Sequence, residues 1–298
     1  MQSYHSVVLK GYANGADGKV GFCYSATDKD PNPVSCLYVE TTSIQADNSY
    51  ELTVDDLLPR TKYYYRAFAT KDSKTVLAKE VKTFVTENFK PDAVDLGLSV
   101  KWANCNVGAT APEQYGDYFV WGETEPYYSD GHSQDNPCKN WKSGKSEGYE
   151  WPSYKWCNGS YNTRTKYCSS ADLGTVDNKT VLDPEDDAAT ANWGGFWRMP
   201  NIDELKELQN NCTWKFTSIN GVNGYKVTGM NGNSIFLPAA GRRIGSSISG
   251  VGSSGSFWSS MLNTSNSSNA YYFNFSGGDI DYSNDNCILG MSVRPVCE

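Results

Sequence analysis

The sequence predicts a mainly β protein with a smaller α+β part: an N-terminal β-sandwich followed by an α+β domain. At 298 residues the chain is longer than most single domains, which favours two of them. Short runs of β-branched and aromatic residues recur through the first part, whereas the second combines hairpin signals with one short helical pattern. A proline follows the last β pattern of the first part, within residues 88–93, so we place the domains at residues 1–88 and 92–298.

Six strand-like runs fill the first domain, and polar turns such as those at residues 14–18 and 29–33 separate them. Their spacing predicts a small antiparallel sandwich of about seven strands. The runs cover residues 6–9, 20–24, 36–42, 50–54, 62–70 and 76–85.

A corner signal lies just before the fifth of these runs, where Leu57, Leu58 and Pro59 precede Tyr63. This segment resembles the corner of fibronectin type III domains, in which a tyrosine hydroxyl bonds back to the backbone of the turn. The resemblance covers roughly residues 5–87 and assigns the corner role to Tyr63. It implies a domain that serves as a spacer rather than as a binding module.

The second domain carries local sequence signals for one helix and two hairpins. Asn201 with Glu204 three residues later, followed by leucines at helical spacing, predicts a short amphipathic helix over residues 201–208. Asn231-Gly232 predicts one hairpin, and residues 276–279 predict a second between 271–275 and 280–282. The stretch 125–190 is long and aromatic, and loops of that length are usually functional or held by other contacts.

Several motifs of this domain occur in one order over about 200 residues. They are DLGLSVKWANCNVGA at 95–109, YGDYFVWGET at 115–124, WGGFWRMP at 193–200, NCTW at 211–214, FLPAAG at 236–241 and VRPV at 293–296. Together they resemble the Fibrobacter succinogenes major paralogous domain family, which is common in exported proteins of gut Bacteroidetes. The resemblance implies a C-type-lectin-like fold, which formylglycine-generating enzymes and the variable proteins of diversity-generating retroelements also use.

The last forty residues alternate fixed aromatic positions with Asn, Ser, Asp and Tyr, a composition typical of an adaptable binding surface on a rigid scaffold. We expect Trp258 and Arg294 to be packed framework. Strand alternation puts Tyr271, Phe273 and Phe275 on one face and Tyr272 and Asn274 on the other. This texture is similar to that of retroelement-diversified proteins, and the alternative is polar loop filler. The predicted ligand-binding residues are Tyr272, Asn274, Ser276, Asp279, Asp281, Tyr282, Asn284, Asn286, Asn263, Asn266 and Asn269.

Charge and hydropathy narrow the classes of partner. The net charge of -8 leaves no basic stripe for a phosphate backbone, so we expect no nucleic acid partner. No apolar run is long enough for a membrane span. The N-terminus lacks a signal-peptide pattern, so the protein is either intracellular or numbered after a removed leader. The family resemblance implies the cell surface or secretion.

Catalysis finds little support in the sequence. A formylglycine-generating enzyme needs a closely spaced cysteine pair, whereas Cys287 and Cys297 are ten positions apart. His5 and His132 are the only histidines, and neither has the surroundings of a general base. The nine cysteines show no metal-ligand spacing, and both disulfides and free buried thiols remain open readings.

We expect no cofactor. The acidic run at residues 183–187 leaves calcium as the one candidate, but it lacks the spaced pattern of a calcium loop. A solvated loop or a helix N-terminus is the preferred reading.

These observations predict a non-catalytic binding protein that recognises a glycan or a protein through its C-terminal hairpin. The alternative is a structural or assembly component, such as a fimbrial tip or a phage receptor-binding protein, in which the same surface docks a partner subunit.

Overall fold

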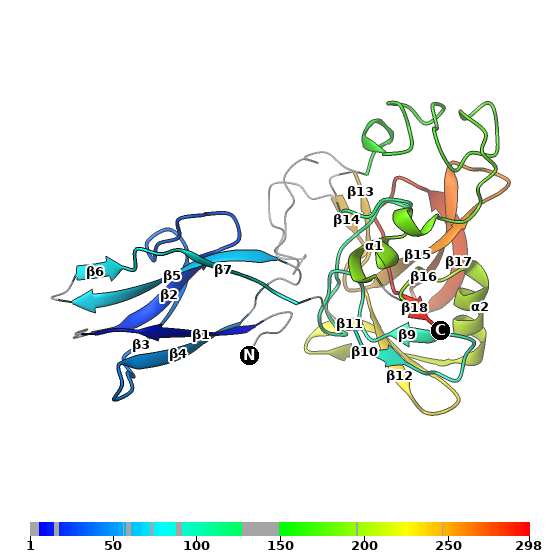
Figure 1. Ribbon diagram of the computed structural model, residues 1–298. Coiled ribbons are helices and arrows are strands. Elements are labelled where there is room, and N and C mark those ends of the chain that lie inside the picture. The colour runs from blue at the N-terminus through cyan, green and yellow to red at the C-terminus, as the bar shows by residue number, and fades with distance from the viewer. Residues whose placement is uncertain are drawn as a thin grey trace. The chain divides into compact units, whose positions relative to one another are not determined.

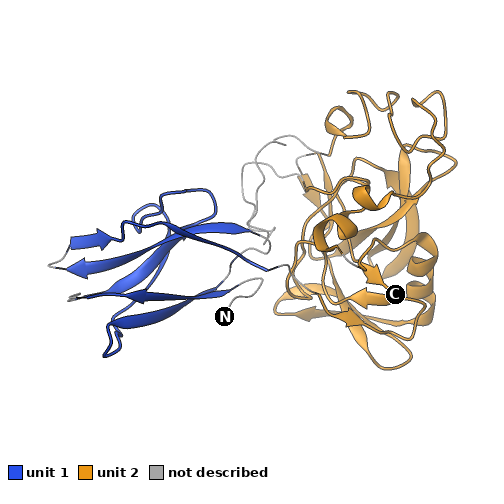
Figure 2. Ribbon diagram, viewed as in Figure 1, with its two compact units in different colours: residues 1–90 blue, residues 91–298 orange. Residues whose placement is uncertain are grey.

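The computed structural model describes residues 6–14, 18–55, 57, 61–71, 74–87, 91–126, 149–194, 196–245 and 247–298. The protein is mainly β, with several separate sheets and two short α-helices in the described part (Figure 1). The chain divides into two compact units, Met1–Lys90 and Pro91–Glu298 (Figure 2). The division between residues 90 and 91 falls inside the stretch in which the sequence changes character.

Two sheets form the first unit. One pairs β1 with β4, and the other has the order β3-β2-β5-β6 with β7 also paired to β5. Their strands are β1 (Val7–Tyr12), β2 (Val20–Ser25), β3 (Leu37–Thr41), β4 (Ser49–Val54), β5 (Lys62–Lys71), β6 (Lys74–Leu77) and β7 (Lys82–Val85).

Both sheets contribute to one apolar core. Leu9 and Val54 from the smaller sheet meet Val20 and Phe22 from the larger one, and all four are buried. Tyr50 of β4 also donates its hydroxyl to the Gly21 carbonyl of β2 at 3.2 Å, so a hydrogen bond as well as apolar contact ties the sheets together.

The expected run 76–85 is two strands rather than one. β5 is ten residues long, and its end at residues 68–71 pairs with β6 while its start at 62–65 pairs with β7. One long partner therefore accommodates two short strands, which a linear pattern does not reveal. Tyr63 is buried, whereas the proposed corner turn at residues 58–60 lies outside the described residues.

The second unit contains four small sheets, of orders β10-β11-β12, β13-β14, β15-β16-β17 and β18-β9-β8. Their strands are β8 (Ala93–Val94), β9 (Lys101–Ala103), β10 (Thr213–Ile219), β11 (Val222–Thr228), β12 (Ser234–Pro238), β13 (Arg242–Ile244), β14 (Ser247–Ser249), β15 (Ser254–Leu262), β16 (Asn269–Ser276), β17 (Asp279–Asn286) and β18 (Val296–Cys297). The helices are α1 (Ala188–Trp193) and α2 (Ile202–Asn211), with short 3-10 turns η1 (Trp151–Ser153) and η2 (Pro184–Asp186).

The predicted helix and both predicted hairpins are confirmed. Asn201 caps α2 by accepting the backbone N–H of Asp203 and Glu204, and Glu204 accepts the backbone N–H of Asn201 in return. β11 pairs with β12 across the Asn231-Gly232 turn, and β16 pairs with β17 across Gly277-Gly278.

Strands β15 and β16 separate two apolar cores. Trp258 and Tyr272 belong to the core on one side, whereas Phe257, Phe273 and Phe275 belong to the core on the other. The second core also receives the apolar face of α2, which lies beside β17 in Figure 1. Because both faces of β16 are covered, strand alternation distributes its side chains between two cores and not between a core and solvent.

The expectation that Tyr272 is an exposed ligand contact is therefore wrong. Its side chain is only 6% exposed and meets Trp258 edge-on, with ring centres 6.0 Å apart. The predicted alternation itself is correct, since Tyr272 does point away from Phe273.

The framework role of Trp258 and Arg294 is confirmed. Trp258 is fully buried and donates its indole N–H to the Phe119 carbonyl at 2.8 Å. Arg294 is 1% exposed, and its guanidinium donates to Asn106 Oδ1, the Ala103 carbonyl and the Phe236 carbonyl at 2.8 to 3.0 Å. Burial lowers the pKa of Arg294 to about 10, which leaves it charged at neutral pH.

Separating the chain between residues 90 and 91 should leave each unit folded, because each has a core of its own. We expect the fragment 91–298 to unfold cooperatively at the denaturant concentration at which the second unit unfolds in the full chain. All nine tryptophans lie after residue 100, so tryptophan fluorescence follows this unit in both proteins. A fragment that binds hydrophobic dye and melts without a transition would contradict two independent cores.

Trp258→Ala should lower the free energy of unfolding of the second unit by about 3 to 5 kcal/mol, because it removes a fully buried indole. Urea unfolding followed by tryptophan fluorescence measures the loss. Phe196, which is 85% exposed, supplies the control: Phe196→Ala should change stability by no more than about 0.5 kcal/mol. Equal stability of the two variants would show that Trp258 is not framework.

Candidate functional site

The candidate surface is built on β17, the outer strand of the β15-β16-β17 sheet. β17 pairs with β16 in a register that sets Asn274 opposite Asp281 and Ser276 opposite Asp279. Asp279, Asp281 and Ser276 are exposed, and Asn274 is partly buried. These four side chains share one face of the sheet because directly paired residues point to the same side.

The same face continues along β17 through Ser283 and Asp285. Asp285 accepts a hydrogen bond from Arg242 of β13 at 2.9 Å, in an ion pair that is about one-third exposed on each side. We call Asn274, Ser276, Asp279, Asp281, Ser283 and Asp285 the β17 acidic face. Ser283 and Asp285 were not predicted, although their two-residue spacing after Asp279 and Asp281 signals the same face of the strand.

Tyr282 and Asn284 belong to the opposite face. They pair with Phe273 and Tyr271, so they point toward the core that α2 covers. The ammonium of Lys206 lies 5.1 Å from the centre of the Tyr282 ring. The expectation that Tyr282 and Asn284 form one patch with Asn274, Asp279 and Asp281 is therefore wrong, because the register of the hairpin separates them.

Asn263 and Asn266, which lie before β16, shape the turn between β15 and β16. Asn263 Oδ1 accepts the backbone N–H of Ser265 at 2.9 Å, and Asn266 Oδ1 accepts that of Ser268 at 3.1 Å. Asn263 is 8% exposed, which contradicts its assignment as a ligand contact. Its side chain has the local turn-forming role to which asparagine is suited.

Two further predicted contacts lie where the start of β16 pairs with the end of β17. Asn269 donates to Asn284 Oδ1 at 2.9 Å, a cross-strand bond that fixes the end of the hairpin. Asn286, at the end of β17, is exposed. It lies outside the β17 acidic face, because it is two residues from Asn284 and four from Tyr282, and its side chain therefore points to the same side as theirs.

The outer edge of β17 is closed to strand addition. Asp281 and Asp285 each accept the backbone N–H of the residue that follows, at 2.7 and 2.8 Å. Gln209 of α2 donates to the Ile280 carbonyl at 2.6 Å. Side chains thus occupy backbone groups that an added strand would need, as protected sheet edges do. A ligand on this surface would be recognised by side chains.

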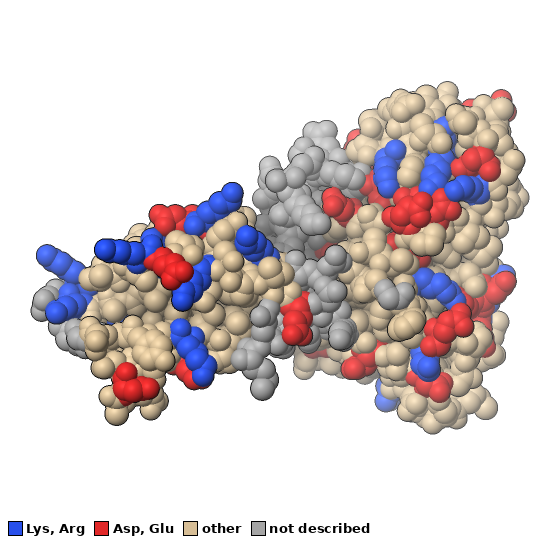
Figure 3. All heavy atoms as spheres, in the orientation of Figure 1, with Lys and Arg blue, Asp and Glu red and all other residues tan. Residues whose placement is uncertain are grey.

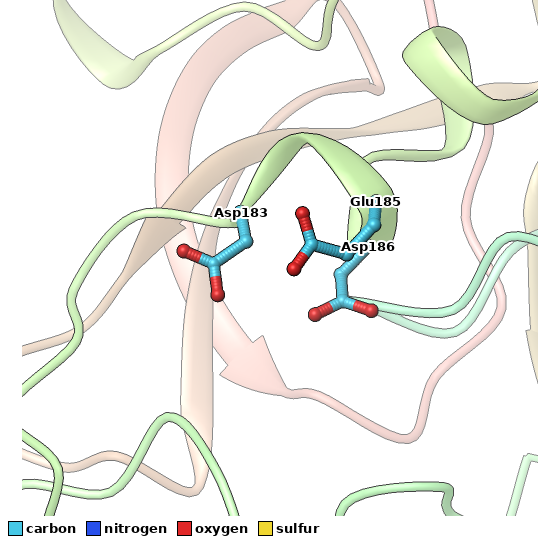
Figure 4. Close-up of side chains that lie close together, drawn as sticks. All are labelled: Asp183, Glu185 and Asp186. Carbon is cyan, nitrogen blue, oxygen red and sulfur yellow. The ribbon is translucent and has the colours of Figure 1, made fainter.

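A second cluster of charges holds the segment that precedes α1. Asp183, Glu185 and Asp186 bring three carboxylates together on and beside η2 (Figure 4). Lysines form ion pairs with these carboxylates: Lys166 lies 2.6 Å from Asp183 and 2.5 Å from Asp186, and Lys155 lies 3.0 Å from Asp186.

The ion pairs with lysine indicate a structural role for this cluster rather than a cation site. We call Asp183 and Asp186 with their lysine partners the Asp186 clamp. Lys179 also contacts Asp183 at 2.5 Å, so three ammonium groups face the two inner carboxylates, while Glu185 is exposed. The next acid, Asp187, caps α1 by accepting the backbone N–H of Ala189 and Thr190. This cap agrees with the helix N-terminus reading of the acidic run.

Asp186 is the centre of the clamp. Its side chain is 2% exposed and accepts from Lys166, from Lys155 and from the Tyr167 hydroxyl at 2.7 Å. Burial by itself would raise the pKa of Asp186, but the hydrogen bonds from Lys166, Tyr167 and Lys155 outweigh it and lower the pKa below 3.8. The carboxylate is thus charged and paired at neutral pH.

The surface and the thiols give no sign of other chemistry. On the face shown in Figure 3, basic and acidic side chains are interspersed, and no continuous basic stripe crosses it. The eight cysteines that the structure describes are free thiols, and burial raises the pKa of Cys287 to about 11. Among the described residues, no helix is both long and apolar enough to span a membrane. Both histidines lie outside the described residues.

Comparison of the chain with protein-family models, with curated proteins and with solved structures finds no match. The site is therefore interpreted from its own residues.

Replacing Asp186 with Asn should destabilise the second unit, because the change leaves Lys166 partly buried without its closest carboxylate. Since the folded-state pKa of Asp186 is lowered, its stabilisation is complete above the ordinary carboxyl value of 3.8 and is lost as the pH falls through the lowered folded-state value. Wild-type stability should thus drop more steeply than that of the variant below about pH 4.

Denaturant midpoints of both proteins between pH 3 and pH 7 measure this difference. Glu185→Gln is the matched control, because Glu185 is exposed and outside the lysine contacts. Parallel pH curves for wild type and Asp186→Asn would show that the clamp contributes nothing.

Proposed function

We propose that the chain is a non-catalytic cell-surface or secreted protein that binds a glycan or protein ligand. In this proposal the first unit is a fibronectin type III-like spacer and the second a C-type-lectin-like head of the Fibrobacter major paralogous type. The β17 acidic face is the recognition surface. The motif series quoted above supports the fold assignment, and the arrangement of the first unit's seven strands in two sheets is compatible with a spacer.

The observation that carries the proposal is the contrast between a rigid sheet and its polar edge strand. β15 and β16 have packed cores on both faces, so they fix β17 in place. β17 then exposes carboxylates with amide and hydroxyl groups beside them on β16. Such groups accept and donate several hydrogen bonds each, and a rigid support lowers the entropic cost of binding.

The chemistry of the face suits a ligand rich in hydrogen-bond donors. Asp279 and Asp281 are acceptors only, whereas the Asn274 amide and the Ser276 hydroxyl also donate. Sugar hydroxyls and the polar edge of a protein both offer such donors.

Single replacements Asn274→Ala, Asp279→Ala and Asp281→Ala should leave stability within about 0.5 kcal/mol and should abolish ligand binding. Glycan and protein arrays probed with the full chain, with and without calcium, identify the ligand and measure the loss. Asn286→Ala is the matched control, because Asn286 is exposed on the same strand and lies outside the β17 acidic face. Loss of binding in the control alone would move the site to the face that α2 covers, and binding that survives the triple replacement would refute the proposal.

A further inference from the structure

Arg164 is a buried cation that forms no ion pair with a described carboxylate. Its side chain is 1% exposed, and Nε, Nη1 and Nη2 reach no oxygen acceptor in the described structure; the guanidinium contacts the weakly accepting Cys287 thiol instead. Arg294 is equally buried, yet each of its three guanidinium nitrogens donates to an oxygen. Burying a guanidinium without an oxygen acceptor is costly, so such a residue requires an explanation.

The backbone holds Arg164 in this position. Its N–H donates to the Leu173 carbonyl, and its own carbonyl accepts the N–H of Thr175, both at 2.8 Å. A further β-bridge joins it to Cys157. With both sides of the residue paired, the backbone directs its side chain into the interior.

The groups around the guanidinium are neutral. Arg164 Cζ lies 5.4 Å from the centre of the Tyr154 ring, and the thiols of Cys157 and Cys287 are its other ionisable neighbours. Burial raises the pKa of Cys157, and it raises the pKa of Cys287 to about 11 despite the nearby positive charge. Burial also raises the pKa of Tyr154 well above its ordinary value, and its hydroxyl donates to the Trp121 carbonyl at 3.0 Å.

None of these neighbours supplies a negative charge at neutral pH, and arginine does not deprotonate in proteins. We propose that Arg164 binds a small monovalent anion of halide type inside the second unit. The guanidinium donates its N–H groups to the anion, and the neutral Cys157 and Cys287 thiols add weak S–H donors. A multiply charged oxyanion such as phosphate would leave a negative charge buried without compensation, because one guanidinium neutralises only one charge.

The enclosure of the site determines when the anion enters. The three guanidinium nitrogens are shut off from solvent, so the anion is taken up as the second unit folds. An anion that binds the folded chain and not the unfolded chain raises stability with its concentration. This inference does not depend on the proposed ligand-binding function, since Arg164 is not part of the β17 acidic face.

The test compares thermal unfolding of the full chain in sodium chloride and in sodium methanesulfonate at equal ionic strength. Tryptophan fluorescence reports the second unit, because all nine tryptophans lie there. We expect Tm to be higher in chloride by about 5 °C once chloride exceeds its dissociation constant about a hundredfold. Arg164→Met should abolish the difference, whereas Arg243→Met, which alters another buried arginine, should keep it.

Crystals of the wild-type chain grown in bromide give a second readout, which remains informative if Arg164→Met does not fold. An anomalous peak beside the Arg164 guanidinium supports the proposal. Equal Tm values in the two salts, or a bromide crystal without such a peak, would overturn it and leave Arg164 as a buried cation that the fold tolerates.

Discussion

The fold of the second unit depends on the buried guanidinium of Arg294. One planar group joins three distant segments, since its donors reach Ala103 at the end of β9, Asn106 after it, and Phe236 in β12. A charge this deeply buried stabilises a structure only when its hydrogen-bond donors are satisfied. Breaking one of these contacts leaves part of the charge uncompensated in the low-dielectric interior. The segment from residue 292 to 296 is thereby fixed, and β18 pairs with β9 directly after it.

The fixed segment 292–296 positions strands β15 and β16. Ser292 bonds to the backbone of β15, and Trp258 of β15 reaches back to Phe119 through its indole N–H. β15 and β16 therefore lie between two cores with no freedom to shift register, because a slip of one residue would exchange the aromatic sets of the two cores. The β17 acidic face is rigid for the same reason, because β17 pairs with β16 along its whole length.

Ion pairs and hydrogen bonds, rather than helices or strands, hold residues 149–186 in place. Asp186 pairs with Lys155 and with the adjacent residues Lys166 and Tyr167, and so ties together two parts of residues 149–186. Trp156 lies beneath the ammonium groups of Lys155 and Lys166, at 4.2 and 4.9 Å from its ring. This clamp explains how a loop-rich segment packs against the core, and it differs from Arg164 nearby, where the positive charge has no carboxylate.

Local patterns determined much of this protein. The alternation of strands, the capping box of α2 and the two glycine-containing hairpins were all predictable, because each depends on residues close together in the chain. The framework role of Trp258 and Arg294 was predictable from residue type. Only the tertiary structure decided which face each β17 residue occupies and that Tyr272 and Asn263 are buried, because burial depends on what packs against a strand and not on its own alternation. The Asp186 clamp and the uncompensated Arg164 were likewise beyond the sequence, since both join groups that only folding brings together.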